Sequence, residues 1–387
     1  MATNVNMGNR IINMCHALIS RTHIVVLLLL MIGTIPAEGK KKIASKKDTL
    51  QLKIDSIQQA FASIKINYDK ENEKAYLKQK YDTAKLFNLT RQMFSTLAEL
   101  DSADVKKNAK PKFRKKNGEL LNGYRRNLFN GGNYYLRRNK YEDAFMFYED
   151  YIVSASMPML AQYDYLSTDT LMPRVAFWSM VAGSLQHKPE EVLKYSDLAY
   201  NWVRQEQVLQ FKANAYRELN KDEDYEATLM KGFTEFPGYV FFFNNLVALY
   251  SDKGRLEEGL KLCNEALKLD VAVQPENKQT FRYAKSGFLL KEKKWDECIV
   301  ECEQLIVEDS TFAMPYYNAG LCYLNKAEPL TRKEKKEKKS LLNISRKYLE
   351  TYRDMKPQEK DKWAPLLYRV YFNLNLGKHF KDMERKM

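Results

Sequence analysis

Tyr250-Ser-Asp-Lys-Gly-Arg-Leu-Glu-Glu-Gly-Leu-Lys-Leu-Cys-Asn-Glu-Ala-Leu-Lys-Leu-Asp270 is the stretch that decides the expected fold. Just before it, Phe243, Leu246 and Val247 lie at the spacing of one helix face. The small residue Gly259, in the helix that follows, lets two antiparallel helices approach closely. The stretch therefore predicts a helical hairpin.

Related copies of this hairpin recur along the chain. The equivalent position of the first helix falls at residues 132, 180, 213, 247, 286 and 320. The successive spacings are 48, 33, 34, 39 and 34 residues, so three of the five lie within one residue of 34. A single hairpin cannot bury its apolar face, whereas a stack of hairpins can. The repeat therefore predicts stacked helical hairpins.

This 34-residue pattern resembles the tetratricopeptide repeat (TPR), strongly at 240–310, weakly at 172–200, and over roughly 125–385 in all. Val271 departs from it, because the family usually carries Pro there. The strings at 126–135, 233–237 and 363–371 are most similar to exported TPR proteins of the Gram-negative envelope. The resemblance implies an all-α fold, a right-handed α-solenoid of TPR-like helical hairpins that serves protein–protein contact without catalysis.

Residues 1–37 have the pattern of a cleavable N-terminal signal peptide. Arg10 and Arg21 precede an apolar run of 12 residues at 24–35, and Ala37 or Gly39 offers a small residue for cleavage. A membrane-spanning helix needs roughly 20 residues. An uncleaved anchor is the alternative, because positive charge at 40–42 resists translocation. We expect an exported protein of the periplasm or outer envelope of a Gram-negative bacterium.

The remaining chain divides by charge and by the strength of the repeat. Residues 38–105 predict an N-terminal helical hairpin, and 106–124 a basic linker with seven Lys and Arg between 106 and 116. Residues 125–387 predict the TPR-like superhelix, with C-terminal capping helices. Within it, 327–340 is a charged insertion, expected as a solvated helix extension or loop.

The composition excludes several classes of protein. The chain has 63 Lys+Arg against 49 Asp+Glu, and the net charge of +14 is spread along its 387 residues. Nucleic-acid-binding domains usually gather basic residues on one face, so we expect no nucleic-acid partner. Phosphate loops, dinucleotide-binding turns, zinc-protease motifs and nucleophile elbows do not occur in the sequence. We therefore expect no enzyme and no cofactor.

Four cysteines follow the leader: Cys263, Cys298, Cys302 and Cys322. Cys298 and Cys302 share a helical face, as metal ligands do, and four cysteines in an exported chain also fit disulfides. Aligned with the repeat, however, the cysteines fall at packed helix positions. We favour small apolar packing residues and expect no metal site.

The expected partner is a protein or peptide that lies against the first helices of the hairpins. Amides there can pair with a peptide backbone, and aromatic rings with its side chains. The carboxylate clamp of chaperone-binding relatives is not matched, because Ala248 stands where that pattern has Asn. The expected partner-binding residues are Arg126, Phe129, Asn133, Gln207, Gln210, Asn214, Arg217, Asn244, Tyr283 and Tyr317.

Several alternatives to a peptide-binding function, and some further properties of the chain, stay open at this point. The protein could be a glycan-binding accessory protein of the envelope, or it could bind an acidic partner through the basic segments 106–116 or 332–339. Membrane contact is expected only peripherally or through an uncleaved leader, and the oligomeric state is open. Five Asp-Ser/Thr-aliphatic triplets, at 48, 55, 82, 101 and 169, resemble an envelope O-glycosylation acceptor, although Asp at a helix start is more often an N-cap.

Overall fold

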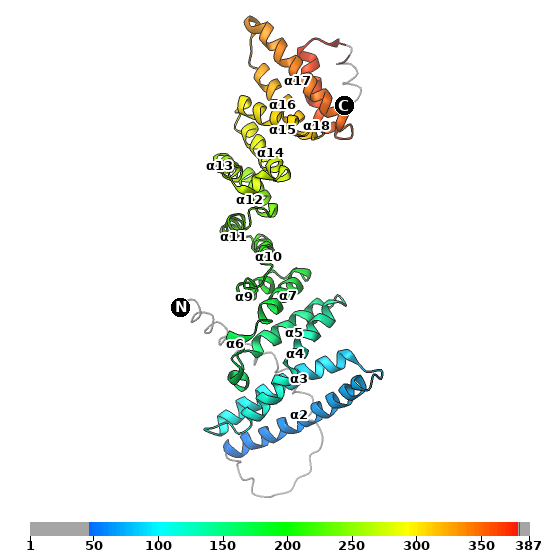
Figure 1. Cartoon of the computed structure of the whole chain (residues 1–387), viewed down its shortest axis with the longest axis vertical. Helices are drawn as coiled ribbons and strands as arrows, with labels where there is room; N and C mark the ends of the chain where they lie inside the picture. Colours follow the sequence, from blue (N-terminus) through cyan, green and yellow to red (C-terminus); the bar gives the residue numbers. More distant parts are fainter. Residues whose placement is uncertain (1–45, 378, 380–387) are drawn as a thin grey trace, which may run out of the picture. The chain divides into compact units, whose positions relative to one another are not determined.

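The computed structural model describes residues 46–377 and 379, and this part of the chain contains helices and no strand (Figure 1). The expected all-α fold is confirmed for these residues. The expected signal peptide, residues 1–37, lies outside them. None of the described helices is both long and apolar enough to span a bilayer.

The chain divides into two compact units, Met1–Lys221 and Asp222–Met387. The boundary falls inside 125–387, which the sequence analysis treats as one superhelix. We call the two parts unit 1 and unit 2.

Unit 1 begins with the expected N-terminal hairpin, α2 (Lys46–Tyr76) packed on α3 (Thr83–Lys107). The predicted linker 106–124 is wrong in extent, because α4 (Arg114–Leu136) already begins at Arg114. Acidic groups of α3 hold the basic segment in place. Asp104 is fully buried and accepts the backbone N–H groups of Lys112 and Phe113, while Arg114 pairs with Asp101 at 2.9 Å.

The rest of unit 1 continues as successive helices. They are α5 (Tyr141–Ser154), η2 (Pro158–Tyr163), α6 (Tyr165–Thr168), α7 (Met172–Leu185), α8 (Pro189–Lys194), α9 (Ser196–Ala199) and α10 (Gln205–Glu218). The short helices η2 and α6 occupy the connector that the sequence predicts at 154–170. Helix α5 packs between α4 and α7, so neighbours along the chain are neighbours in the stack.

Unit 2 repeats the hairpin more regularly. It contains α11 (Asp222–Glu235), α12 (Val240–Asp252), α13 (Leu256–Ala266), η3 (Asp270–Val273), α14 (Pro275–Lys291), α15 (Trp295–Glu308), α16 (Ala313–Ala327), η4 (Arg332–Glu334), α17 (Lys335–Met355) and α18 (Lys360–Asn373). The stretch 250–270 forms the end of α12, a turn and α13, as predicted. Gly254 sits in this turn at φ +67°, a conformation that favours glycine. The charged insertion 327–340 is helical from Lys335 onward.

Glycines face aromatic rings where consecutive helices meet. A Cβ at Gly132 would lie 2.3 Å from the ring of Tyr148, and one at Gly259 would lie 2.2 Å from the ring of Phe288. Both distances are far below van der Waals contact. The close approach expected at Gly259 is therefore present, and its ring comes from the next helix along the chain.

The four cysteines of unit 2 are fully buried, which confirms their expected packing role. The Sγ atoms of Cys298 and Cys302 lie 4.0 Å apart, and the Cys298 thiol donates to the carbonyl of Ser286. Burial raises the pKa of Cys263 to about 12, so this thiol stays protonated at neutral pH. Within 46–377, no group of three or more His, Cys, Asp or Glu could hold a metal ion.

Candidate functional site

Helix α4 and its C-cap residue, Arg137, carry a line of polar side chains along one face. Asn122, Arg126, Asn130, Asn133 and Arg137 follow one another at steps of four, four, three and four residues, which keeps them on one side of a helix. All five are half-buried or exposed. We call this set the α4 stripe. It contains two residues that the sequence places in the binding face, Arg126 and Asn133.

The C-terminal part of the stripe opens into a hollow of about 300 Å³. The Tyr148 hydroxyl donates to Asn133 Oδ1 at 2.9 Å, which fixes that amide. Its two N–H donors have no hydrogen-bond partner among residues 46–377. Arg138 lies 3.6 Å over the ring of Tyr134 and forms one wall. The lining residues are Thr83, Phe87, Asn130, Asn133, Tyr134, Arg137 and Arg138.

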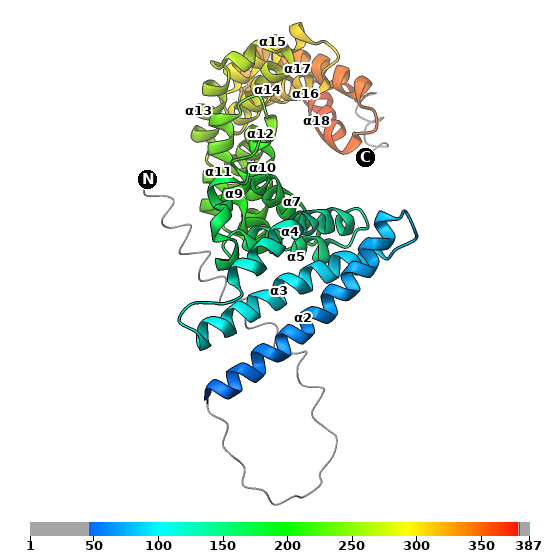
Figure 2. The ribbon, with the colours of Figure 1, turned by 60° about the horizontal axis from the view of Figure 1, so that its bottom comes forward.

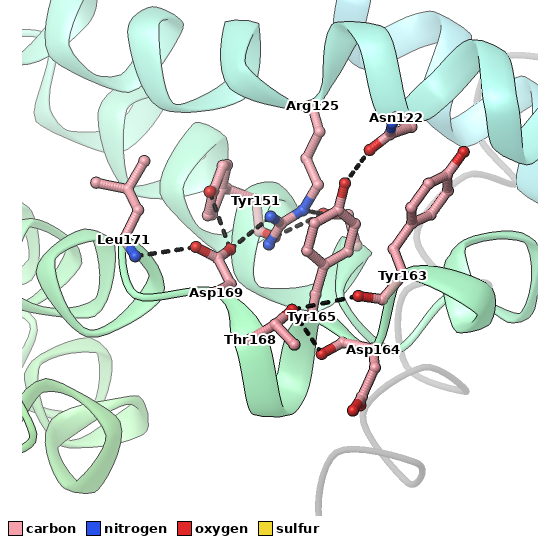
Figure 3. Close-up of polar contacts among 10 residues, drawn as sticks. Asn122, Arg125, Tyr151, Tyr163, Asp164, Tyr165, Thr168, Asp169 and Leu171 are labelled. Atoms are coloured by element: carbon pink, nitrogen blue, oxygen red, sulfur yellow. Dashed lines mark hydrogen bonds and ion pairs between the residues drawn. The ribbon is translucent and has the colours of Figure 1, made fainter.

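The N-terminal part of the stripe borders a second hollow, of about 350 Å³, and Arg125 is one of its lining residues. Figure 3 shows the polar contacts of Arg125. Arg125 is 4% exposed, and its guanidinium lies 3.9 Å from the ring centres of both Tyr151 and Tyr165. It forms an ion pair with Asp169 and donates to Ser154 at 2.9 Å. The guanidinium is thus enclosed on both faces and along its edge.

The partners of Arg125 are themselves connected. The Tyr151 hydroxyl donates to Asp169 at 3.0 Å, and the Tyr165 hydroxyl donates to Asn122 of the α4 stripe. Burial raises the pKa of Tyr151, and the Arg125 guanidinium opposes that rise, so the hydroxyl remains a proton donor at neutral pH. We conclude that this cluster fastens the connector of η2 and α6 to α4.

Sequence reasoning missed Arg125 and misplaced Phe129. Phe129 was expected to face a partner, but it is 6% exposed and packs against Tyr148 and Tyr151 of α5. Its position one helical turn after Arg125 puts both side chains on the face that α5 covers. Neighbouring helix positions point about 100° apart, so Arg125 can point toward α5 while Arg126 is exposed, and the adjacent pair alone does not indicate which of the two is buried.

The other expected residues of unit 1 lie together on α10. Gln207, Gln210 and Asn214 are half-buried, and Arg217 is exposed. Arg217 Nη2 lies 3.5 Å from Asn214 Oδ1, and Gln207 accepts a bond of 3.3 Å from Arg204. The structure therefore brings these four residues onto one helix face.

The expected residues of unit 2 differ in exposure. Asn244 is exposed on α12, whereas Tyr283 of α14 and Tyr317 of α16 are half-buried. Tyr283 packs against Phe312 and Tyr317 against Tyr352, each with ring centres 5.2 Å apart. Burial raises the pKa of Tyr283 and of Tyr317, and the positive charge of Lys362 opposes both shifts. The charge of Lys362 therefore acts on both tyrosines, which lie on different helices. Asn244 lies on a third helix, α12.

No family model matches the chain, and no curated protein does. Similar solved structures include TPR repeat proteins. The C-terminal part of one from Cytophaga hutchinsonii is 9% identical, with 66% of this chain and 92% of that chain covered and a TM-score of 0.45. A TPR repeats protein from Bacteroides fragilis is 20% identical, with 64% and 97% covered and a TM-score of 0.33. The TPR2AB-domain:pHSP90 complex of yeast Sti1 is 14% identical, with 64% and 99% covered and a TM-score of 0.26.

Every one of these TM-scores is below 0.5, so these similarities do not indicate what this chain binds.

Proposed function

We propose that the protein is a non-catalytic scaffold that binds an extended peptide segment of another protein, with the α4 stripe as its main contact. The observation that carries this proposal is the set of three amides and two guanidinium groups along one accessible helix face. Asn130 offers a donor and an acceptor to a peptide backbone, whereas Asn122 and Asn133, whose Oδ1 atoms accept from tyrosine hydroxyls, offer their amide N–H donors. The two Arg of the stripe add charge-assisted bonds to carboxylates.

The length of the stripe defines the peptide. Arg126 and Arg137 are 11 residues apart, which is about 16 Å along a helix axis at 1.5 Å per residue. An extended chain covers that distance in about five residues. Neither Arg has a carboxylate partner among the described residues. The preferred peptide therefore carries acidic side chains about five residues apart.

The α10 face in unit 1, and Asn244, Tyr283 and Tyr317 in unit 2, are proposed as additional contacts for a longer partner. Half-buried amides and tyrosines lose little side-chain freedom on binding, because packing already restricts them. Phe129 is left out of the proposed contact surface because it is buried.

The proposed location is the periplasm or outer envelope of a Gram-negative bacterium, after export. The apolar run at 24–35 and the small residues at 37 and 39 support this proposal. Intact mass of protein expressed in a secreting host tests it. A new N-terminus directly after Ala37 or Gly39 is the expected result, and a full-length product embedded in the membrane would contradict it.

The peptide proposal is tested by selecting a displayed library of random heptapeptides on the full chain. We expect peptides rich in Asp and Glu, and we expect Arg126→Ala with Arg137→Ala to weaken their binding about tenfold or more. The matched control, Arg332→Ala with Lys333→Ala, removes two exposed cations from η4 and should change binding less than about twofold.

Equal loss in both double variants would show that net charge alone attracts the peptides. Selection of no peptide, combined with retention of the chain on envelope polysaccharide, would favour the glycan-binding alternative.

A further inference from the structure

Three turns of unit 1 lie at the same end of its antiparallel helices: 77–82 between α2 and α3, 137–140 between α4 and α5, and 186–188 between α7 and α8. The first two appear on the same side of the molecule in Figure 1, and the hollow beside Thr83 is also lined by Arg137. An ion pair of 3.6 Å between Lys188 and Glu142 joins the third turn to the start of α5, which directly follows the second turn. We call this surface the turn edge.

The first two turns of the turn edge carry positive charge without ion-pair partners, whereas Lys188 of the third turn is paired with Glu142 and Glu191. Asp82 is the one acidic residue in the first two turns, and it caps α3 by accepting the backbone N–H of Lys85 at 2.9 Å. Five cations there have no carboxylate within ion-pair distance among the described residues. They are Lys78, Lys80, Arg137, Arg138 and Lys140.

Turns of unit 2 are different. Lys253 pairs with Asp222 at 2.9 Å, Arg255 with Glu226 at 2.6 Å, and Lys294 with Glu292 at 2.6 Å. Pairing of turn cations is thus common in unit 2, although Lys293 has no ion pair among the described residues. In unit 1 the third turn resembles unit 2, because Lys188 is paired with Glu142 and Glu191, and the unpaired cations lie in the first two turns. The charge of the turn edge is a property of this surface rather than of hairpin turns in general.

Large apolar side chains are exposed among these cations. Tyr76 is 85% exposed, Leu77 53%, Tyr81 37% and Leu185 47%. Burial of such side chains is favourable, so their exposure together at one edge marks a contact surface. Tyrosine combines an apolar ring with a polar tip, which suits the boundary between lipid headgroups and acyl chains.

A buried carboxylate fixes the first turn in this presentation. Glu71 accepts the backbone N–H of Asp82 at 3.1 Å and the ammonium groups of Lys74 and Lys85 at 3.2 Å each. The turn closes through a bond of 2.8 Å from the Gln79 N–H to the Lys74 carbonyl. The exposed side chains at the tip are thus held outside the helix pair.

We propose that the turn edge docks peripherally on an anionic lipid bilayer. The open cations meet headgroup phosphates, and Tyr76, Leu77 and Tyr81 enter the interfacial region beneath them. A small soluble anion would satisfy the cations but leave these apolar side chains in water, so a lipid surface fits both observations. This inference goes beyond peptide binding; the two proposed surfaces share Arg137, and the lipid test below leaves Arg137 unchanged.

The test is a local reporter of lipid contact, because the apolar run at 24–35 could hold the full chain on any vesicle. In a Cys15→Ser chain, Gln79→Cys is labelled with an environment-sensitive fluorophore. The four other cysteines are fully buried and should not react in the native protein. We expect a blue shift of the fluorophore emission with vesicles that contain both phosphatidylglycerol and phosphatidylcholine, and we expect salt to reduce this shift. Vesicles of phosphatidylcholine alone should cause no shift. A label at Ala109→Cys, at the opposite end of α3, should not shift.

Matched variants separate the turn edge from net charge. Lys78→Gln, Lys80→Gln and Lys140→Gln together should raise the lipid concentration for a half-maximal shift about tenfold or more. The control variant, Lys106→Gln, Lys110→Gln and Lys116→Gln, removes the same charge at the opposite end and should change it less than about threefold.

Tyr76→Ser with Leu77→Ser changes no charge and should also weaken the shift at least severalfold. All of these side chains are exposed, so circular dichroism should show the same helicity in each variant. The proposal is overturned by no shift at position 79, by an equal shift at position 109, by an equal loss in the control variant, or by full binding of the Tyr76/Leu77 variant.

Discussion

Arg125→Ala is the substitution whose effect on the free energy of unfolding follows most directly from the contacts of unit 1. The substitution leaves the Asp169 side chain, which is 7% exposed, without its cation. Removing one partner of a buried ion pair costs about 3–5 kcal/mol. Asp169 keeps two bonds, from the Tyr151 hydroxyl at 3.0 Å and the Leu171 N–H at 2.9 Å, so we place the loss near the lower end, at about 3 kcal/mol.

Two companion variants separate charge from geometry. Arg125→Lys keeps the cation but loses the planar group that lies between two tyrosine rings, so it should cost about 1–2 kcal/mol. Arg126→Ala, at the exposed neighbouring position, should change stability by less than about 0.5 kcal/mol. Urea unfolding followed by circular dichroism measures the total cost.

Hydrogen exchange shows where that cost falls. Segment 158–171 should lose protection in Arg125→Ala, because the guanidinium ties this connector to α4. A loss below about 1 kcal/mol with unchanged exchange at 158–171 would refute the assignment of Arg125 as the fastening group.

Three further predictions concern packing, protonation and thiols. Gly132→Ala places a methyl group against the Tyr148 ring and should destabilise the protein by about 1–3 kcal/mol in urea unfolding, whereas Gly287→Ala meets open space and should be neutral or slightly stabilising. The Asp82 N–H, with the ammonium groups of Lys85 and Lys74, lowers the pKa of Glu71 from 4.5 to about 2. The stabilising contribution of Glu71 is therefore complete above about pH 4.5 and is lost as the pH falls toward 2. Thermal melts of the wild type and Glu71→Gln should therefore differ at pH 7 and converge at low pH; an equal difference at both would contradict this. Thiol titration should find the four cysteines of unit 2 unreactive in the native protein and all free after denaturation, and fewer than four free thiols would reveal a disulfide.

Local patterns predicted much of the fold. The stretch 250–270 forms its hairpin because the turn at Gly254, the small residue Gly259 and the apolar helix face all indicate the same structure. The linker prediction at 106–124 failed for a specific reason. The Lys-rich composition indicates a solvated chain, but Asp104 accepts the backbone N–H of Lys112, 8 residues further on, and Asp101 accepts from the guanidinium of Arg114, 13 residues further on.

The candidate site was only partly predictable. Arg126 and Asn133 are where helical spacing places them, since exposure on a regular helix follows from period alone. Burial of Arg125 depends on Asp169, which lies 44 residues further on in an irregular connector, and no repeat pattern encodes that meeting. The ion pairs of Lys253 with Asp222 and of Arg255 with Glu226 likewise join different hairpins, so a single-helix pattern does not predict them.

The glycine–aromatic contacts have a consequence for how the chain folds. Gly132 meets Tyr148, Gly232 meets Phe242, and Gly259 meets Phe288, so the partners are 16, 10 and 29 residues apart in sequence. Contacts this short in sequence carry little loop-closure entropy and favour rapid folding. Each ring can reach its glycine once the next helix has left the ribosome. The molecule can therefore assemble from one end while the other end is still unfolded, and under a pulling force it should yield in hairpin-sized steps.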